Sequence, residues 1–298
     1  MRWLSKSAGG NDREGRRGMF DLSQRQMEKL LQLSGPRSEG KAMPDGQDMD
    51  TLAYLWMGLD AGLSVLVSGT SANSTLAVVS ALVSLIHPRR KLAVIEKRAF
   101  SVGLESKILA SIGLYGRIYG ITAEKRIGEL AMDMPDRIII DEMGRHEARK
   151  LFSTASRGIP FIAGMPACGG PFRILEYLTA KKTGMGVGDL CSLDLLVLAG
   201  ASGRICSVFD YDWLSKAEAG EYIEMGGDGV NSRKMSDGKS LDMHRFPRSK
   251  VARRFGMQYG YSIDRCTSEL KRRSVFLANT YPEGRFLSSD YVESARLL

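Results

Sequence analysis

A run of small polar residues between an apolar strand and an amphipathic helix is the stretch of this chain best suited to chemistry. Residues 65 to 86 read VLVSGTSANSTLAVVSALVSLI. They have the outline of a phosphate-binding loop, in which backbone N–H groups at a helix N-terminus cradle phosphate oxygens. On the eight-residue pattern G-x-x-x-x-G-K-[ST], the candidate nucleotide-binding residues are Gly69, Thr70, Ser71, Ala72, Asn73, Ser74, Thr75 and Leu76.

Three positions of this pattern lack the groups that nucleotide chemistry needs. Ser74 falls at the second glycine, Thr75 at the lysine and Leu76 at the hydroxyl that binds Mg²⁺. No lysine occurs between residues 67 and 86, so the charge that reaches the β- and γ-phosphates is missing. If the pattern is shifted by one residue, Thr75 falls at the Mg²⁺-binding position. This register requires a one-residue deletion in the loop, and the loop still contains no lysine. The alternative interpretation is a strand-to-helix turn that binds no ligand.

Two acidic residues follow a second apolar strand. The segment DRIIIDEMG, residues 136 to 144, delivers Asp141 and Glu142 at the carboxyl end of three isoleucines. In an open α/β sheet, ligands bind at that end of the strands, so this pair is a candidate second acidic strand of a nucleotide site. The alternative is a pair at a helix start, where a carboxylate is favourable by up to ~1 kcal/mol.

The elements that must position these residues alternate between strands and helices. The strands are uniformly apolar, which is typical of a parallel sheet covered on both faces, so the fold class is α/β. The first helix has Asp48 or Asp50 as its cap. Strands are predicted at 64–69, 91–96, 136–144, 160–165, 193–200 and 204–212, and helices at 48–62, from the loop to 86, within 100–130, at 146–156 and at 173–182.

Three regions are predicted along the chain. Residues 1–47 form a disordered tail, a short helix at 21–33 and a linker; residues 48–230 form the α/β domain; residues 231–298 form a basic linker and a helical C-terminal segment. Between 231 and 273 there are twelve Lys or Arg against four Asp or Glu, which equals the whole net charge of +8. A basic stretch of this kind meets nucleic acid, anionic lipid or an acidic partner, or is simply a solvated face. The scarcity of aromatic residues argues against nucleic acid.

Composition limits the remaining options. The chain has 298 residues, 43% of them hydrophobic, enough for one ordinary domain and a smaller appendage. No apolar run approaches the roughly 20 residues that cross a bilayer, and the first residues lack an apolar signal core, so a cytoplasmic location is expected. The four cysteines are far apart and only three histidines accompany them, which predicts buried free thiols, no disulfide and no metal site.

Four segments resemble the motor ATPases of the type II/IV secretion superfamily, most closely the archaeal branch that assembles archaella and type IV pili. TLAYLWMGLDAGLSVLVSG matches the helix and strand before that family's phosphate loop. The loop itself resembles the family's GGTASGKTT with its functional positions altered. KLAVIEKRAF resembles the family's acidic box and keeps Glu96, and RIIIDEMGRHEA resembles the second acidic strand, with Glu142 at the family's glutamate. The segment that begins with SELKRR is similar to the C-terminal end of the archaeal proteins, so the resemblance covers residues 48–298.

The resemblance implies a RecA-like P-loop NTPase domain with a mainly parallel central sheet and a helical C-terminal extension. It implies ATP and Mg²⁺ as cofactors, and Glu142 and Glu96 as the catalytic residues. Several departures accompany it. Gly144 stands where the family has an arginine, and residues 157–170, at the position of the family's histidine box, contain no histidine. The family's arginine-bearing N-terminal domain is expected to be absent or reduced to residues 1–47. ATP and Mg²⁺ binding is therefore expected to be weak or absent.

Two functional hypotheses follow. The first is a degenerate, non-hydrolysing member of the family that serves as a partner or regulatory subunit of a secretion, pilus or archaellum motor. It binds a complete paralogous motor ATPase, a membrane platform protein or its own copies in a ring, and lies in the cytoplasm or peripherally at the inner face of the membrane. The second is an active ATPase with a non-standard site built from Glu142, Glu96 and Asp141. Its cations come from a neighbouring subunit or from Lys97, Arg98 or Arg145.

Overall fold

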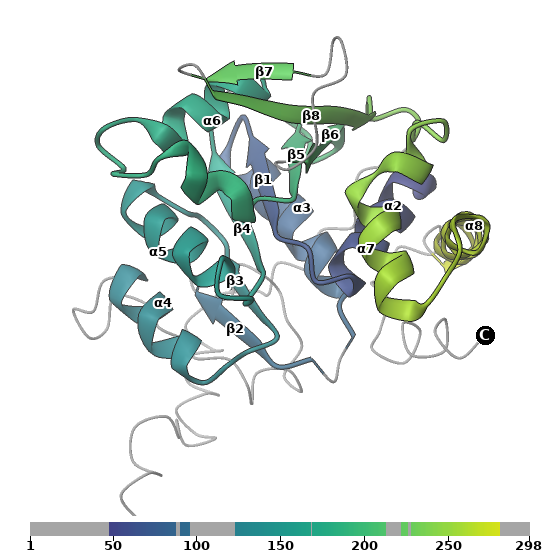
Figure 1. The fold of residues 1–298 in the computed structure, drawn as a ribbon, viewed down its shortest axis with the longest axis horizontal. Helices are drawn as coiled ribbons and strands as arrows, with labels where there is room; N and C mark the ends of the chain where they lie inside the picture. The colour runs from purple at the N-terminus through teal and green to yellow at the C-terminus, as the bar shows by residue number, and fades with distance from the viewer. Residues whose placement is uncertain are drawn as a thin grey trace, which may run out of the picture. The chain divides into compact units, whose positions relative to one another are not determined.

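The computed structural model describes residues 48–87, 90–95, 123–167, 169–212, 222–225 and 228–280. Several sequence predictions fall outside these residues: the tail and short helix before residue 48, Glu96 with Lys97 and Arg98, and the helical region from 100 to 122. Within the described part, the predicted succession of strands and helices is present (Figure 1).

The core of the fold is one eight-stranded sheet in the order β2-β3-β4-β1-β5-β6-β8-β7. The first five strands in this order are parallel, and the last three continue the sheet in antiparallel pairing. The sheet is thus mainly parallel, and the expected α/β architecture is confirmed. The strands are β1 Val65–Gly69, β2 Leu92–Ile95, β3 Arg137–Ile140, β4 Phe161–Pro166, β5 Leu195–Ala199, β6 Ile205–Asp212, β7 Tyr222–Met225 and β8 Asp228–Ser236.

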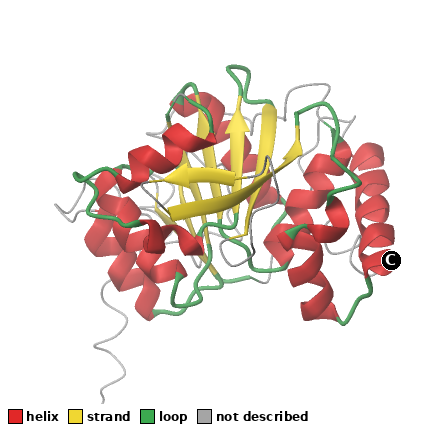
Figure 2. Cartoon of the chain, turned by 45° about the horizontal axis from the view of Figure 1, so that its top comes forward, coloured by secondary structure: helices red, strands yellow, loops and turns green. Residues whose placement is uncertain are grey.

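Apolar cores cover both faces of this sheet, because side chains alternate along each strand. On β1, Val65 and Val67 join one core, and Leu66, between them, joins the other. Helices α2, α3, α7 and α8 pack on the first face, and α4, α5 and α6 pack on the second (Figure 2). The helices are α2 Met49–Asp60, α3 Ala72–Ser84, α4 Ala123–Met132, α5 Arg145–Ala155, α6 Pro171–Thr179, α7 Lys250–Tyr259 and α8 Ile263–Thr280, with 3-10 turns η3 Val187–Ser192 and η4 Phe246–Arg248.

Local sequence explains several helix boundaries. Asp48 is the N-cap of α2, as expected, and its carboxylate accepts hydrogen bonds from the N–H groups of Asp50 and Thr51. Helix α6 begins with Pro171 at its first position, where the missing N–H has no intrahelical partner to lose. Helix α7 ends at Gly260, which adopts φ 66°.

The C-terminal part is continuous with the sheet. The domain boundary expected at residue 230 falls inside β8, which runs from Asp228 to Ser236 and pairs with β6. Beyond it, α7 and α8 contribute Val251, Phe255 and Leu270 to the same core as α2. The predicted helical C-terminal segment is therefore packed against the sheet domain.

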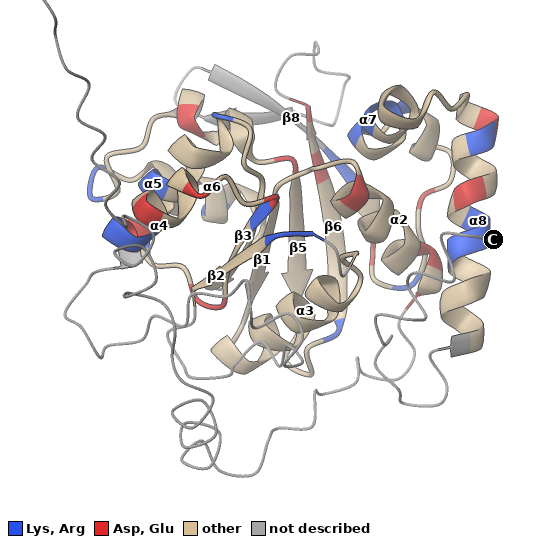
Figure 3. Ribbon diagram, turned by 90° about the horizontal axis from the view of Figure 1, so that it is seen from below, with Lys and Arg blue, Asp and Glu red and all other residues tan. Residues whose placement is uncertain are grey.

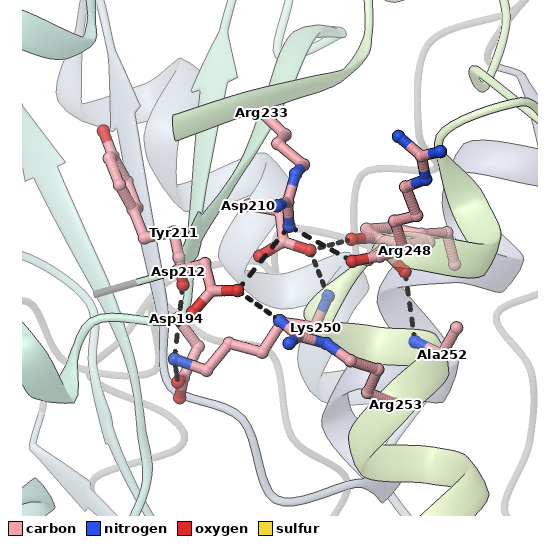
Figure 4. A network of polar contacts seen from close by, with 11 residues as sticks. Asp194, Asp210, Tyr211, Asp212, Arg233, Arg248, Lys250, Ala252 and Arg253 are labelled. Carbon is pink, nitrogen blue, oxygen red and sulfur yellow. Dashed lines mark hydrogen bonds and ion pairs between the residues drawn. The ribbon is translucent and has the colours of Figure 1, made fainter. Parts of the chain in front are cut away.

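Part of the basic stretch is internal, so the expectation of a solvated face is wrong for Arg233, Lys250 and Arg273, whose side chains are 8%, 19% and 5% exposed. Lys250 Nζ lies 2.5 Å from Asp194 Oδ1, and Arg253 Nη2 lies 2.5 Å from Asp212 Oδ2 (Figure 4). Arg233, with a side chain only 8% exposed, lies 3.7 Å from the same Asp212 oxygen. The pairs of Lys250 and Arg253 hold α7 against β6 and the residue before β5, and the pair of Arg233 joins β8 to β6; Asp212, shared by two of them, is only 8% exposed, so the local dielectric is low and the pairing is stronger than in water.

The thiols are free, as predicted, at the three described cysteines, although only one of them is buried. Cys266 lies in the core between α7 and α8, whereas Cys191 and Cys206 are exposed. Across the described ranges, no three or more His, Cys, Asp and Glu side chains are grouped so that they could hold a metal ion. None of the helices in that part of the chain is both long and apolar enough to cross a membrane.

Candidate functional site

The turn between β1 and α3 is much shorter than the eight-residue loop that the sequence pattern suggested. Strand β1 ends at Gly69 and α3 begins at Ala72, so only Thr70 and Ser71 lie between them. The remaining candidates, from Ala72 to Leu76, belong to the first turns of the helix. The expected loop is therefore replaced by a direct strand-to-helix turn, and α3 carries no charged residue (Figure 3).

A reciprocal pair of serine contacts makes this short turn possible. Ser71 is the N-cap of α3, and its Oγ accepts the Ser74 N–H at 3.1 Å. In return, the Ser71 N–H donates to Ser74 Oγ at 3.2 Å. This capping box satisfies helix-terminal donors within the turn itself. A phosphate loop would instead offer such N–H groups to phosphate oxygens.

The two functional positions after the turn point into the protein. Thr75, at the lysine position of the pattern, is fully buried, and its Oγ1 donates to the Ser71 carbonyl at 2.9 Å. Leu76, at the Mg²⁺ position, packs against the apolar core. Gly69 is required by this packing, because a Cβ there would lie 2.7 Å from Thr75 Oγ1 and 2.8 Å from Ser74 Oγ. The residues in register with the catalytic positions thus serve the turn and the core.

The acidic pair lies after β3, as predicted. Asp141 is 4% exposed, and its Oδ1 accepts the Glu142 N–H at 2.7 Å. Helix α5 begins three residues after Glu142, with Gly144 as its N-cap. The Gly144 N–H donates to Glu147 Oε2 at 2.9 Å, so Glu147 makes the capping contact that the sequence assigned to the acidic pair.

Strand β4 brings the serine turn and the acidic pair together. It lies between β1 and β3, and its Gly164 pairs with Val67. A Cβ at Gly164 would lie 2.2 Å from the Asp141 carbonyl oxygen and 2.9 Å from Thr75 Cγ2. Thr75 and Asp141 therefore flank the same glycine. Sequence reasoning missed Gly164, although a glycine inside a strand signals close approach of another backbone.

Two other expected contributors occupy different environments. The guanidinium of Arg145, a candidate cation, lies 4.5 Å from the ring centroid of Tyr177 on α6, a cation–π contact. The segment aligned with the histidine box, 157–170, contains β4 among its described residues. Glu96, the other proposed catalytic carboxylate, lies outside the described residues.

The serine cap gives a direct test of this geometry. We expect Ser71→Ala to lower the free energy of unfolding by about 1 kcal/mol, because the Ser74 N–H loses its partner. Urea unfolding followed by circular dichroism measures the change. Ser84→Ala is the matched control: its hydroxyl donates to the Ala81 carbonyl inside the same helix, and its removal leaves no donor unsatisfied. Equal costs for the two variants would contradict the cap.

No protein-family model and no curated protein matches the sequence. Solved structures that resemble the chain include three secretion-system ATPases. The VirB11 ATPase of the Brucella suis type IV secretion system, in complex with sulphate, aligns at 17% identity over 65% of this chain and 59% of its own, with a TM-score of 0.42. The DotB ATPase of Legionella pneumophila aligns at 7% identity over 80% of this chain and 59% of its own, with a TM-score of 0.36. The DotB ATPase of Yersinia pseudotuberculosis aligns at 9% identity over 83% of this chain and 60% of its own, with a TM-score of 0.38. Each alignment spans less than two thirds of the neighbouring chain.

Proposed function

We propose that this chain is a non-hydrolysing member of the type II/IV secretion motor ATPase superfamily, akin to its archaeal pilus and archaellum branch. It acts as a partner or regulatory subunit of such a motor. The observation that carries the proposal is the two-residue turn between β1 and α3, where the nucleotide loop of an active motor would stand. Ser71 and Ser74 close that turn on each other, and Thr75 is buried.

The donor set does not fit Mg²⁺-nucleotide. Leu76 has no oxygen for a hard cation, and the Thr75 hydroxyl donates to the Ser71 carbonyl. No lysine between residues 67 and 86 can meet the β- and γ-phosphates. Such charge contacts are typically worth orders of magnitude in phosphoryl-transfer rate, so their combined absence argues against turnover. We derive no catalytic step through the nucleotide.

The retained features support a role in assembly. The RecA-like sheet, the acidic pair after β3 and the sequence resemblance over residues 48–298 keep the family scaffold without its nucleotide loop. Such a scaffold can join a ring with a complete paralogous motor ATPase or with its own copies, or bind a membrane platform protein. With these partners, the chain would act in the cytoplasm, at the inner face of the membrane.

Nucleotide binding by the purified full chain tests the proposal. A fluorescent ATP analogue is titrated with and without Mg²⁺, and phosphate release is followed in the same samples. We expect no binding up to millimolar nucleotide and no phosphate release. In a second arm, the chain is co-expressed with the complete motor ATPase of its own genome, and we expect the two to co-elute in gel filtration.

The competing hypothesis, an active ATPase with an unusual site, makes the opposite prediction for the acidic pair after β3. It requires Mg²⁺-dependent binding and phosphate release that Glu142→Gln abolishes, and that result would sink the proposal. Glu176→Gln, which removes an exposed carboxylate from α6, is the matched control. Absence of both nucleotide binding and co-elution would reject the partner role while leaving the inactive turn in place.

A further inference from the structure

The corner between α7 and α8, residues 254–265, exposes an unusual group of apolar side chains. Met257 is 71% exposed, Tyr259 42% and Ile263 39%, within seven consecutive residues. They belong to the last turn of α7 and the first residue of α8. Large apolar side chains scattered singly are normal on a surface, whereas three exposed within seven residues of one corner make this corner a candidate interaction site.

The backbone of this corner is held in place from within. Gly260 ends α7 with φ 66°, and the Tyr261 N–H donates to the Gly256 carbonyl at 2.9 Å. A Cβ at Gly256 would lie 2.9 Å from the Tyr261 carbonyl oxygen, so the two segments are in close contact. Phe255, buried beneath, stacks on Tyr259 with ring centroids 4.5 Å apart. The exposed side chains are therefore presented on a defined turn, which lowers the entropy cost of binding.

Two exposed basic residues flank these apolar groups, whereas four other basic residues of α7 and α8 form ion pairs. Residues 250–273 contain seven Lys or Arg against two Asp or Glu, and Figure 3 shows blue segments along the ribbon of α7 and α8, with red ones among them on α8. Lys250 and Arg253 pair with core aspartates, whereas Arg254 and Arg265 are exposed on either side of the corner. The Arg265 guanidinium lies 4.0 Å from the Tyr261 ring centroid. Asp264 is the one acidic residue of the corner.

We propose that the α7–α8 corner docks on an anionic lipid surface. Met257, Tyr259 and Ile263 enter the headgroup region, and Arg254 and Arg265 meet lipid phosphates. Interfacial binding requires this combination of apolar side chains, a Tyr at headgroup level and flanking basic residues. Nucleic acid fits less well, since Met257 and Ile263 offer no flat ring on which a base can stack. The inference does not rest on the nucleotide site.

Vesicle binding by the full chain tests this proposal. Sedimentation with vesicles of phosphatidylcholine containing 30% phosphatidylglycerol is compared with pure phosphatidylcholine, at ~50 and ~300 mM salt. We expect binding to the anionic vesicles only, weakened by salt because the lipid charge is screened. Each basic residue near such a surface contributes about fivefold in affinity, or about 1 kcal/mol. Arg254→Gln with Arg265→Gln should therefore weaken binding about 25-fold.

Matched variants separate the corner from general charge and hydrophobicity. Met257→Ser with Ile263→Ser should abolish most binding, whereas Met132→Ser, at an 84% exposed side chain on α4, should not. Lys181→Gln with Lys182→Gln removes the same charge from an exposed turn after α6. The proposal is overturned if these control variants weaken vesicle binding as much as the corner variants do. It is also overturned if the wild-type chain does not bind anionic vesicles. Corner-dependent binding to duplex DNA but not to vesicles would overturn it in favour of nucleic acid.

Discussion

Arg273→Ala is expected to cost about 3–5 kcal/mol in the free energy of unfolding, the largest effect of any single change proposed for this chain. The Arg273 side chain is 5% exposed, and its Nη1 lies 2.7 Å from Asp60 Oδ2 at the end of α2. Its Nε lies 2.7 Å from Glu269 Oε1 within α8. The guanidinium also stacks over Trp56, 4.5 Å from the ring centroid. One side chain thus joins α8 to α2.

The cost arises mainly from what the truncation leaves behind. Asp60 is only 11% exposed, so it would remain as a buried carboxylate without this partner. Glu269 keeps Arg272, whose Nε lies 2.8 Å away, and suffers less. If this reasoning holds, Asp60→Asn combined with Arg273→Ala should be more stable than Arg273→Ala alone, a coupling that a double-mutant cycle measures.

Urea unfolding of these variants tests the prediction. Lys271→Ala, two residues away on the exposed face of α8, is the control and should change stability by no more than about 0.5 kcal/mol. Arg273→Lys keeps the charge but loses the planar fork that stacks and binds two carboxylates, and should be intermediate. A cost for Arg273→Ala below about 1 kcal/mol would show that the contact to Asp60 contributes little.

Six of the eight strands of the described fold were predictable because their signals are local, whereas β7 and β8 were not predicted. Continuous apolar runs such as Ile138 to Ile140 indicate buried parallel strands, and each predicted strand in the described part is present within a few residues of its expected ends. Cap residues such as Asp48 mark helix starts. The hydrophobic pattern and the capping residues depend on neighbours in sequence, so they can be recognised without knowledge of the fold.

The candidate site was less predictable, because its geometry depends on distant contacts and on a competing local one. The eight-residue pattern assumes a loop, but Ser71 and Ser74 have the spacing of a capping box, which starts the helix at Ala72. Gly164 becomes meaningful only once β4 lies between β1 and β3. The register of a motif alone does not decide between a loop and a helix start.

The same limit explains the misread basic stretch and a buried arginine in β3. Lys250 and Arg273 pair with Asp194 and Asp60, which lie far away in sequence, so charge counting could not distinguish them from exposed residues. Arg137 is the first residue of β3, and nothing in the local sequence indicates that its side chain is buried. Its guanidinium is buried and donates to the carbonyls of Leu59, Leu63 and Phe161, and this burial lowers its pKa to about 10.

The free energy of unfolding is expected to depend on pH through Asp210, at the junction of β6, α2 and α7. The Asp210 side chain is fully buried. Its Oδ2 accepts hydrogen bonds from the Tyr54 hydroxyl at 3.2 Å and from the Lys250 N–H, while Oδ1 has no hydrogen-bond partner in the described structure (Figure 4). Burial raises the pKa of Asp210 to about 6, although the Lys250 N–H and the charges of Lys250 and Arg233 act in the opposite direction.

A raised pKa means that the folded protein holds the proton of Asp210 more tightly than the unfolded chain, whose value is 3.8. The stabilisation is complete below pH 3.8 and is lost as the pH rises through about 6. Two pKa units correspond to about 3 kcal/mol. We therefore expect the stability of the wild-type chain, relative to Asp210→Asn, to fall by about 3 kcal/mol between pH 4 and pH 7.5.

Urea unfolding of the wild type and Asp210→Asn at half-unit pH steps measures this difference in the free energy of unfolding. Because the two proteins are nearly isosteric, the contributions of all other titrating groups cancel in the difference. Asp237→Asn is the control of opposite sign. Hydrogen bonds from the Lys239 and Ser240 N–H groups lower the pKa of Asp237, so the wild type should gain stability relative to this variant as the pH rises. A difference between the wild type and Asp210→Asn that stays constant from pH 4 to 7.5 would contradict a buried carboxylate that ionises near neutrality. A fall between about pH 4 and pH 6 would show that Asp210 ionises inside the fold at a cost that its hydrogen bonds and the charges of Lys250 and Arg233 only partly offset.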